Sequence, residues 1–404
     1  MKRTVLALLA LATAAWCAAA PVAFGQEPVQ IGPGPLNGYY TYLPLRGVTT
    51  EEAMRGSLAA TTIPMWAYTT TASMDRGGGS FSGVMVGRSP FFHGATTTNI
   101  TTFIVPVKII MPASGGGGTF DPSVADATCL GGNVPTTVFQ NSPIFQSAPF
   151  TMNTVNVGTT QYIDAFQRAN FFNENVSPTG DRYHTKLSPI TTLSVQTFTV
   201  PTDKGATFVG LPCGFLGVMD IATFDAFVQG TIVPLVAAQT GGGPTSLPII
   251  LLYNVVMANP FVPNTLAHCC ILGYHSAFGS PVQTYSVGDF DSTGGGFTNV
   301  SDVTAPSHEV GEWMDDPLVT NATPAWGGIG QVSGCQNNLE VGDPLSGTTG
   351  MLIPVTLSGF TYHAQELAFY SWFFGGPSTG ADSDFSNNET FEGDAKVCPP
   401  GGTN

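Results

Sequence analysis

The sequence has 404 residues, of which 43% are hydrophobic and 10% are charged, with 27 acidic residues against 12 basic ones. This length suits one large domain or two ordinary domains with a sizeable core. The net charge of -15 disfavours binding to nucleic acid or anionic lipid and favours cations. The hydrophobic content excludes a disordered acidic chain.

Residues 1–25 have the pattern of a secretory signal peptide. Lys2 and Arg3 precede an apolar run, and Ala23 and Gly25 supply the small side chains of a cleavage site. The apolar run is too short for a permanent anchor, and no later run predicts a membrane span. We therefore expect cleavage after Gly25 and a secreted or periplasmic protein. Loss of two basic residues and no acidic residue would leave a net charge of -17.

Six cysteines follow the predicted cleavage site, which is an even number. In an oxidising compartment this favours disulfides over zinc thiolates, and no CxxC pair is present. Fifteen pairings are possible and the sequence does not choose among them. We predict at least two disulfides among Cys129, Cys213, Cys269, Cys270, Cys335 and Cys398.

The first half of the chain is rich in glycine, threonine and proline, which predicts a β- and loop-rich region. Residues 26–95 show weak periodicity and are expected to form an irregular N-terminal segment. Hydrophobic patterning then predicts four elements. They are a strand at Thr101–Pro112, a helix at Thr159–Phe172, a strand at Leu193–Val200, and a helix at Ala222–Ala238 interrupted at Pro234.

The second half is more regular. Three strands are predicted at Leu247–Ala258, Cys269–Phe278 and Val282–Phe290, and a helix at 304–316 follows them. A long loop then leads to a last helix at His363–Phe374. A sheet followed by a polar helix and a second, later helix is the layout of a zincin-type α+β domain. We therefore expect one zincin-like domain with a mixed sheet over residues 96–400, with its metal site within residues 247–374.

The predicted helix carries the sequence SHEVGEWMDDP, which resembles the zinc motif HExxH with glutamate as its last residue. His308 and Glu312 are four residues apart, so both can bind one ion from the same helix face. Glu309 lies beside them, where a general base would hold a water molecule. Val310 and Trp313 lie on the opposite face, as in any half-buried amphipathic helix.

Two further features favour a metal site over a surface helix. Four acidic residues and one histidine fall within nine positions, and a cation would relieve their repulsion. Glu340 and Asp343, in the sequence LEVGDP, follow at a distance that suits a third ligand from a loop. Candidates for an alternative ligand, or for a residue that supports the ligands, are Asp343, Asp316 and His275.

The combination of SHEVGEWMDDP with the later tryptophan and LEVGDP resembles a pattern in secreted bacterial proteins. These proteins are related to the phosphate-induced/EXORDIUM group and are regarded as zincin-like. The resemblance covers roughly Leu247 to Phe374. It implies that His308 and Glu312 bind metal, that Glu309 is the general base, and that Glu340 is the third ligand.

The leading hypothesis is a secreted zinc-dependent hydrolase acting on peptides or proteins through metal-activated water and Glu309. One alternative is a non-catalytic secreted or surface protein with a structural metal. A carbohydrate- or wall-binding protein is a third. Because oxygen ligands predominate, Ca²⁺ and Mn²⁺ remain alternatives to Zn²⁺.

Overall fold

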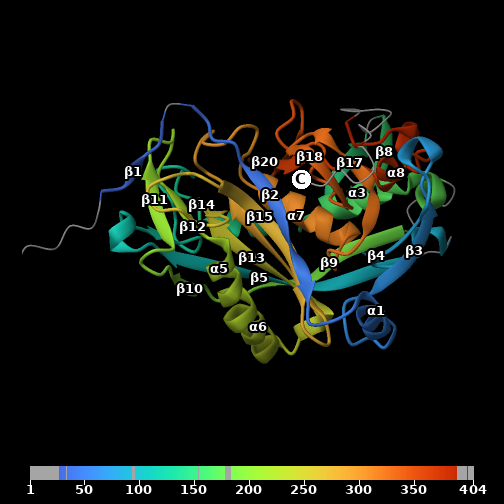
Figure 1. Cartoon of the computed structure of the whole chain (residues 1–404), viewed down its shortest axis with the longest axis horizontal. Helices are drawn as coiled ribbons and strands as arrows, with labels where there is room; N and C mark the ends of the chain where they lie inside the picture. Colours follow the sequence, from blue (N-terminus) through green and yellow to red (C-terminus); the bar gives the residue numbers. More distant parts are fainter. Residues whose placement is uncertain are drawn as a thin grey trace, which may run out of the picture.

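The computed structural model describes residues 27–32, 34–92, 96–152, 154–177, 183–388 and 398. The predicted signal peptide and its expected cleavage point after Gly25 lie outside these residues. The fold is mixed α+β, with one curled sheet and few helices (Figure 1). The α+β class expected from the sequence is therefore confirmed.

Twelve strands of the described residues form the main sheet, in the order β1-β11-β12-β14-β15-β16-β13-β5-β10, with β2 on β15 and with β6 and β9 on β5. Parallel and antiparallel pairs are mixed. The strands are β1 (Val29–Gln30), β2 (Tyr39–Arg46), β5 (Thr96–Ile110), β6 (Thr119–Phe120), β9 (Tyr183–Thr192), β10 (Gln196–Thr199), β11 (Gly205–Val209), β12 (Leu216–Asp220), β13 (Ser246–Tyr253), β14 (Val255–Ala258), β15 (Cys269–Phe278) and β16 (Gln283–Phe290).

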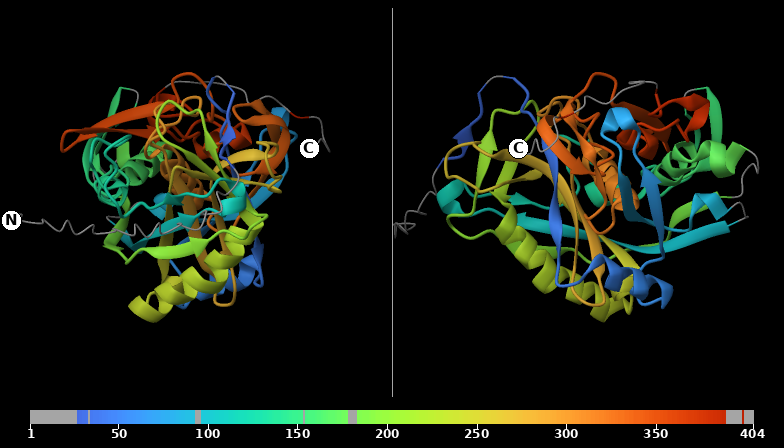
Figure 2. Two further views of the ribbon diagram at one scale, coloured as in Figure 1. Left: turned by 90° about the vertical axis from the view of Figure 1, so that its left-hand side faces the viewer. Right: turned by 45° about the vertical axis from the view of Figure 1, so that its right-hand side comes forward.

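Helices cover both faces of this sheet, which explains why its central strand β13 is buried along its whole length. Ile249 and Leu251 share a core with α3 (Tyr162–Asn170) and α7 (Thr304–Asp315). Ile250 and Leu252 point the other way, toward a helix formed by α5 (Ile221–Phe227), the π turn η5 (Val228–Ile232) and α6 (Val233–Thr240). Figure 2 shows this helix on the side of the sheet opposite to the C-terminal segments.

Four separate hairpins and three further α-helices also belong to the described fold, together with short 3₁₀ and π turns. The hairpin strands are β3 (Met65–Thr71) with β4 (Ser80–Val86), β7 (Ala148–Met152) with β8 (Val155–Thr160), β17 (Ala322–Ile329) with β18 (Val332–Asn338), and β19 (Leu352–Leu357) with β20 (Phe360–Gln365). The helices are α1 (Thr50–Leu58), α2 (Pro135–Gln140) and α8 (Tyr370–Phe374).

The expectation of an irregular segment at residues 26–95 is wrong for its secondary structure, because this segment contains β1, β2, α1, β3 and β4. Strand β2 joins the main sheet in parallel with β15. Its partner lies more than 200 residues away, so local periodicity carries little signal for it. The predicted helix at His363–Phe374 is also wrong in its first half, where β20 pairs with β19 and only α8 is helical.

One predicted break has a different form in the structure, and one predicted strand is interrupted where no break was predicted. The interruption expected at Pro234 is a π turn that ends just before it, because proline lacks an N–H and fits at the first turn of α6. The predicted strand at Leu247–Ala258 is two strands. Asn254 separates them with a φ of 51°, in the left-handed region, and its side chain bonds to Ser292.

The six cysteines expected to form disulfides are paired at bonding distance as Cys129–Cys213, Cys269–Cys270 and Cys335–Cys398. Such pairing is typical of proteins in oxidising surroundings. Among the described residues, one helix, Ile221–Thr240, is long and apolar enough to span a membrane by length and composition alone. A helix that packs on a sheet meets the same criteria, and Phe224, Val228 and Ile232 of this helix are buried against the sheet.

Candidate metal centre

Two paired glycines lie beneath helix α7 and leave room for it to contact the sheet closely. Gly273 on β15 is the register partner of Gly288 on β16. A Cβ on Gly288 would lie 2.9 Å from Cα of Pro306, and one on Gly273 would lie 2.6 Å from Cγ of Glu309. The glycines therefore let the polar face of α7 lie directly on the strands. Contacts with α3, β4 and β20 cover its other sides, and every residue of α7 is buried.

His308, Glu312 and Asp343 form the first of two groups that could hold a metal ion. His308 Nε2 lies 3.0 Å from Glu312 Oε2 and 3.7 Å from Asp343 Oδ1. Within the described part of the chain, this buried nitrogen nevertheless has no hydrogen-bond partner. His308 Nε2 and Glu312 Oε2 are thus close together without a hydrogen bond between them. This separation suits two ligands of one cation, since neighbouring ligand atoms of tetrahedral zinc are roughly 3.3 Å apart.

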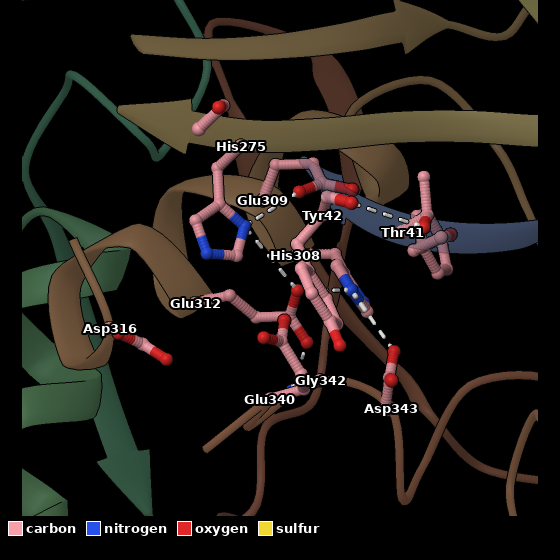
Figure 3. Close-up of polar contacts among 12 residues, drawn as sticks. Thr41, Tyr42, His275, His308, Glu309, Glu312, Asp316, Glu340, Gly342 and Asp343 are labelled. Atoms are coloured by element: carbon pink, nitrogen blue, oxygen red, sulfur yellow. Dashed lines mark hydrogen bonds and ion pairs between the residues drawn. The ribbon is translucent and has the colours of Figure 1, made fainter. Parts of the chain in front are cut away.

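His275, Glu309 and Glu312 form the second group. His275 Nδ1 lies 3.2 Å from Glu309 Oε2 and 3.8 Å from Glu312 Oε2. Glu312 thus belongs to both groups and lies between the two imidazoles (Figure 3). The predicted base Glu309 is held by a histidine on the neighbouring strand, whose role the sequence left open.

The loop after β18 brings both downstream carboxylates to the helix. Asp343 approaches His308 and accepts hydrogen bonds from Gln331 and, at 2.8 Å, from Gln336. Glu340 lies against Glu312 and accepts a hydrogen bond of 2.7 Å from Asn338. Of the two candidates for a third ligand, Asp343 is the one whose carboxylate oxygen lies within 4.8 Å of the ligand atoms of His308 and Glu312.

Asp316 does not join this cluster, although the sequence placed it among the alternative ligands. Its carboxylate accepts hydrogen bonds from the backbone N–H groups of Thr320 and Asn321 at 2.9 and 3.1 Å. Figure 3 shows no contact between this carboxylate and the two histidines. Asp316 therefore fixes the turn after α7, which its position at the end of the helix explains. Asp315 likewise bonds to Asn170 and Gln167 of α3.

Burial dominates the electrostatics of the cluster. It raises the pKa of Glu309, Glu312 and Glu340 well above the usual value, and mutual repulsion adds to the shift for Glu309 and Glu340. Burial also raises the pKa of Asp343 to about 6 and lowers the pKa of His308 to about 4. Among the described residues, the ion-pair partners of these carboxylates are the two histidines and no lysine or arginine. A divalent cation would supply the missing positive charge.

A cavity of about 190 Å³ lies over Asp343, between β2 and the β17–β18 hairpin. Its lining comprises Tyr39, Tyr40, Thr41, Tyr42, Gln331, Val332, Ser333, Gln336 and Asp343. Cavities of about 690 and 440 Å³ lie elsewhere and contain none of the clustered residues. We regard the smaller cavity as the approach to the cluster, because it alone of these three reaches a candidate ligand.

No protein-family model matches the chain, and neither the curated proteins nor the solved structures give a significant match. The kind of site is therefore defined by its residues alone. It is a buried histidine–carboxylate cluster in an α+β fold that could hold a metal ion.

The tyrosines of β2 and the glutamines beside them are the site residues that sequence reasoning missed. Tyr40 stacks on His308 with ring centroids 3.7 Å apart, and Gln331 bonds both to the backbone of Tyr40 and to Asp343. The repeated tyrosines at positions 39, 40 and 42 were the available signal, because aromatic residues are enriched in β-strands. Nothing local indicated which part of the chain that strand would meet.

Proposed function

We propose that the chain is an exported metal-dependent hydrolase, peptidase-like in its chemistry, with α7 as a zincin-like active-site helix. The observation that carries the proposal is the approach of His308 Nε2, Glu312 Oε2 and Asp343 Oδ1 to one another, with the nitrogen left without a hydrogen bond in the described chain. Imidazole and carboxylate ligands suit Zn²⁺, whose bonds to them are about 2.0–2.2 Å long.

A bound Zn²⁺ would polarise a substrate carbonyl and lower the pKa of a water molecule. The other steps belong to the chain. Glu309 would take the proton of that water with its free Oε1, which is buried and has no hydrogen-bond partner among the described residues. His275, 3.2 Å from Oε2, would hold the glutamate in place. Gly273 leaves the room that the Glu309 side chain needs.

The ligand set has a consequence for reactivity. With His308 neutral, Glu312 and Asp343 carry two negative charges and cancel the charge of Zn²⁺. Two histidines and one carboxylate would leave a net positive charge on the ion. Water should therefore be less acidic at this site, and activity should rise toward alkaline pH.

A second candidate function is a structural metal site in a non-catalytic exported protein. Burial favours it, because Asp343 is only 6% exposed and Glu312 only 1%. The cavity above them, of about 190 Å³, is also smaller than ligand sites of the usual range of about 300–1,000 Å³. Export itself is supported by the disulfide pairs together with the signal-like sequence at the N-terminus.

One pair of variants separates the two functions. Glu309→Gln keeps the size of the side chain and removes the proton acceptor. For a hydrolase, metal content and melting temperature should stay nearly unchanged, while cleavage of a peptide library falls by about 10²- to 10⁴-fold. Glu51→Gln, the same change on the exposed helix α1, is the control.

His308→Ala should remove the metal and the stability that the metal lends, in either function. Elemental analysis and thermal melts measure both effects. Peptide cleavage that survives Glu309→Gln at full rate would contradict the catalytic mechanism. One metal ion per chain without any cleaved substrate in a broad screen would favour the structural site.

A further inference from the structure

We infer that Tyr40 is a further catalytic residue, whose hydroxyl donates a hydrogen bond to the substrate oxygen that becomes negative during hydrolysis. This inference rests on the proposed function and names a residue that neither the helix motif nor the loop carboxylates include. It is carried by the placement of the Tyr40 ring and hydroxyl, and by the way in which β2 is fixed to the site.

The ring of Tyr40 lies flat against a candidate ligand. Its centroid is 3.7 Å from that of His308, and the two planes are inclined by only 19°. Tyr40 is 4% exposed, and it lines the cavity above Asp343. Burial, followed by the negative charges of Glu309, Glu312, Asp291 and Asp343, raises the pKa of Tyr40 well above its usual value. The side chain is therefore part of the wall of the cluster.

The hydroxyl of Tyr40 is buried and has no hydrogen-bond partner in the described residues. Buried tyrosine hydroxyls are usually hydrogen-bonded, because leaving one unpaired costs about 1–3 kcal/mol. His308 Nε2 and Glu309 Oε1 are unpaired in the same cluster. Unpaired polar atoms on neighbouring residues of one buried cluster call for an explanation, and a polar occupant that accepts from the Tyr40 hydroxyl would supply it.

The backbone of Tyr40 is held in a fixed position relative to Asp343. The side-chain amide of Gln331 accepts from the Tyr40 N–H at 2.8 Å and donates to the Tyr40 carbonyl at 3.1 Å. The same amide nitrogen donates to Asp343 Oδ1. Gln331 is thus a positioning residue that couples the strand carrying Tyr40 to the loop carrying the third ligand candidate. A hydrogen-bond donor that is held in position before the reaction stabilises the negative charge of the transition state without having to reorganise.

In the proposed addition of water to the substrate carbonyl, each proton has a defined donor and acceptor. When the water oxygen adds to the carbonyl carbon, the π bond of the carbonyl breaks and its electron pair moves to the carbonyl oxygen. Glu309 takes the proton that the water loses. Tyr40 keeps its own proton, since an ordinary tyrosine has a pKa near 10, and stabilises the negative oxygen by donation.

The test uses the full chain loaded with Co²⁺ and the anion acetohydroxamate as the probe of a negative oxygen at the metal. Tyr40→Phe removes the hydroxyl and keeps the stacked ring. We expect Co²⁺ affinity within about twofold of wild type and acetohydroxamate binding weakened by about 10- to 100-fold, followed by the Co²⁺ absorption band. Tyr362→Phe is the matched control, because its buried hydroxyl lies on β20 and bonds to the Val138 carbonyl.

The outcomes separate this inference from the proposed function. Wild type that binds Co²⁺ and acetohydroxamate, with Tyr40→Phe binding both equally well, overturns the role of Tyr40 alone. Loss of Co²⁺ from Tyr40→Phe overturns it too, by making Tyr40 a ligand or a packing residue. Loss of the folded structure in this variant would show that the Tyr40 hydroxyl already has a hydrogen-bond partner within the protein. That result would also overturn the catalytic role of Tyr40. Wild type that binds no Co²⁺ overturns both proposals.

Discussion

Glu340 and Asp343 are three residues apart in one loop, and each has a carboxylate that could return to α7. The helix motif predicted His308, Glu309 and Glu312 from sequence, because positions one turn apart share a face by helix geometry alone. No comparable rule fixes a loop. The choice between the two carboxylates depended on how the turn at Gly342 packs against His308, where a Cβ would collide with the imidazole.

The geometry predicts a clear order of metal affinity. Asp343→Asn should weaken Zn²⁺ binding by about 100-fold or more, since it alters a ligand, and Glu340→Gln by about 10-fold, since it alters a neighbour of one. Competition with a chelating dye measures both. The reverse order would identify Glu340 as the third ligand, as the family resemblance implies.

At the scale of elements, regular hydrophobic patterns predicted the strands and helices around the site. The predicted strand Cys269–Phe278 matches β15 in both bounds, and β16 and α7 lie within one or two residues of theirs. Sequence could not show that β2 completes this region, or that His363 lies on a strand. Both depend on partners distant in sequence, which decide between helix and strand when local preference is weak.

The glycine pair under α7 gives a prediction at this scale. Gly288→Ala places a methyl group 2.9 Å from the Pro306 backbone, so the helix must move away from the sheet. We expect the free energy of unfolding to fall by about 1–3 kcal/mol, with weaker metal binding. Gly230→Ala is the control, because nothing lies within 4 Å of its added carbon. Equal denaturation midpoints for the two variants in urea would contradict a close helix–sheet approach.

At the scale of the molecule, two of the three disulfides join residues that are distant in sequence. Cys129–Cys213 spans 84 residues and Cys335–Cys398 spans 63. We expect the denatured, unreduced protein, isolated from the medium or periplasm, to show no free thiol among these six cysteines. Titration with a thiol reagent measures this. Two or more reactive thiols per mature chain would contradict the observed pairing.

The buried carboxyl groups predict an unusual dependence of stability on pH. Burial raises the pKa of Asp315 and Asp316 to about 7 and that of Asp343 to about 6. Between pH 6.5 and 8 the folded state therefore binds more protons than the unfolded state, and stability falls as pH rises. The two clustered histidines, whose pKa values are lowered, oppose this only below about pH 6.5.

For protein treated with a chelator, we expect the melting temperature to fall by about 2–5 °C between pH 6.5 and 8. Zn²⁺ at saturating concentration should reverse the trend, because protons compete with the metal for the same ligands. Differential scanning calorimetry of both forms measures the two slopes. A melting temperature of the metal-free form that rises over this interval would mean that these carboxyl groups are paired with cations in solution.

The parallel pairing of β2 with β15 also sets a time at which the site can be completed. Tyr40 leaves the ribosome early, but its register partner Gly273 follows 233 residues later. At roughly 5–20 residues per second, about 10–50 s of synthesis separate the two. Through that interval β2 has no β15 to pair with, and long-range pairing of this kind is slow to form. The part of the wall that is synthesised first therefore waits for strands made much later, and any metal ion that needs the finished cluster must bind after Asp343 has also been synthesised.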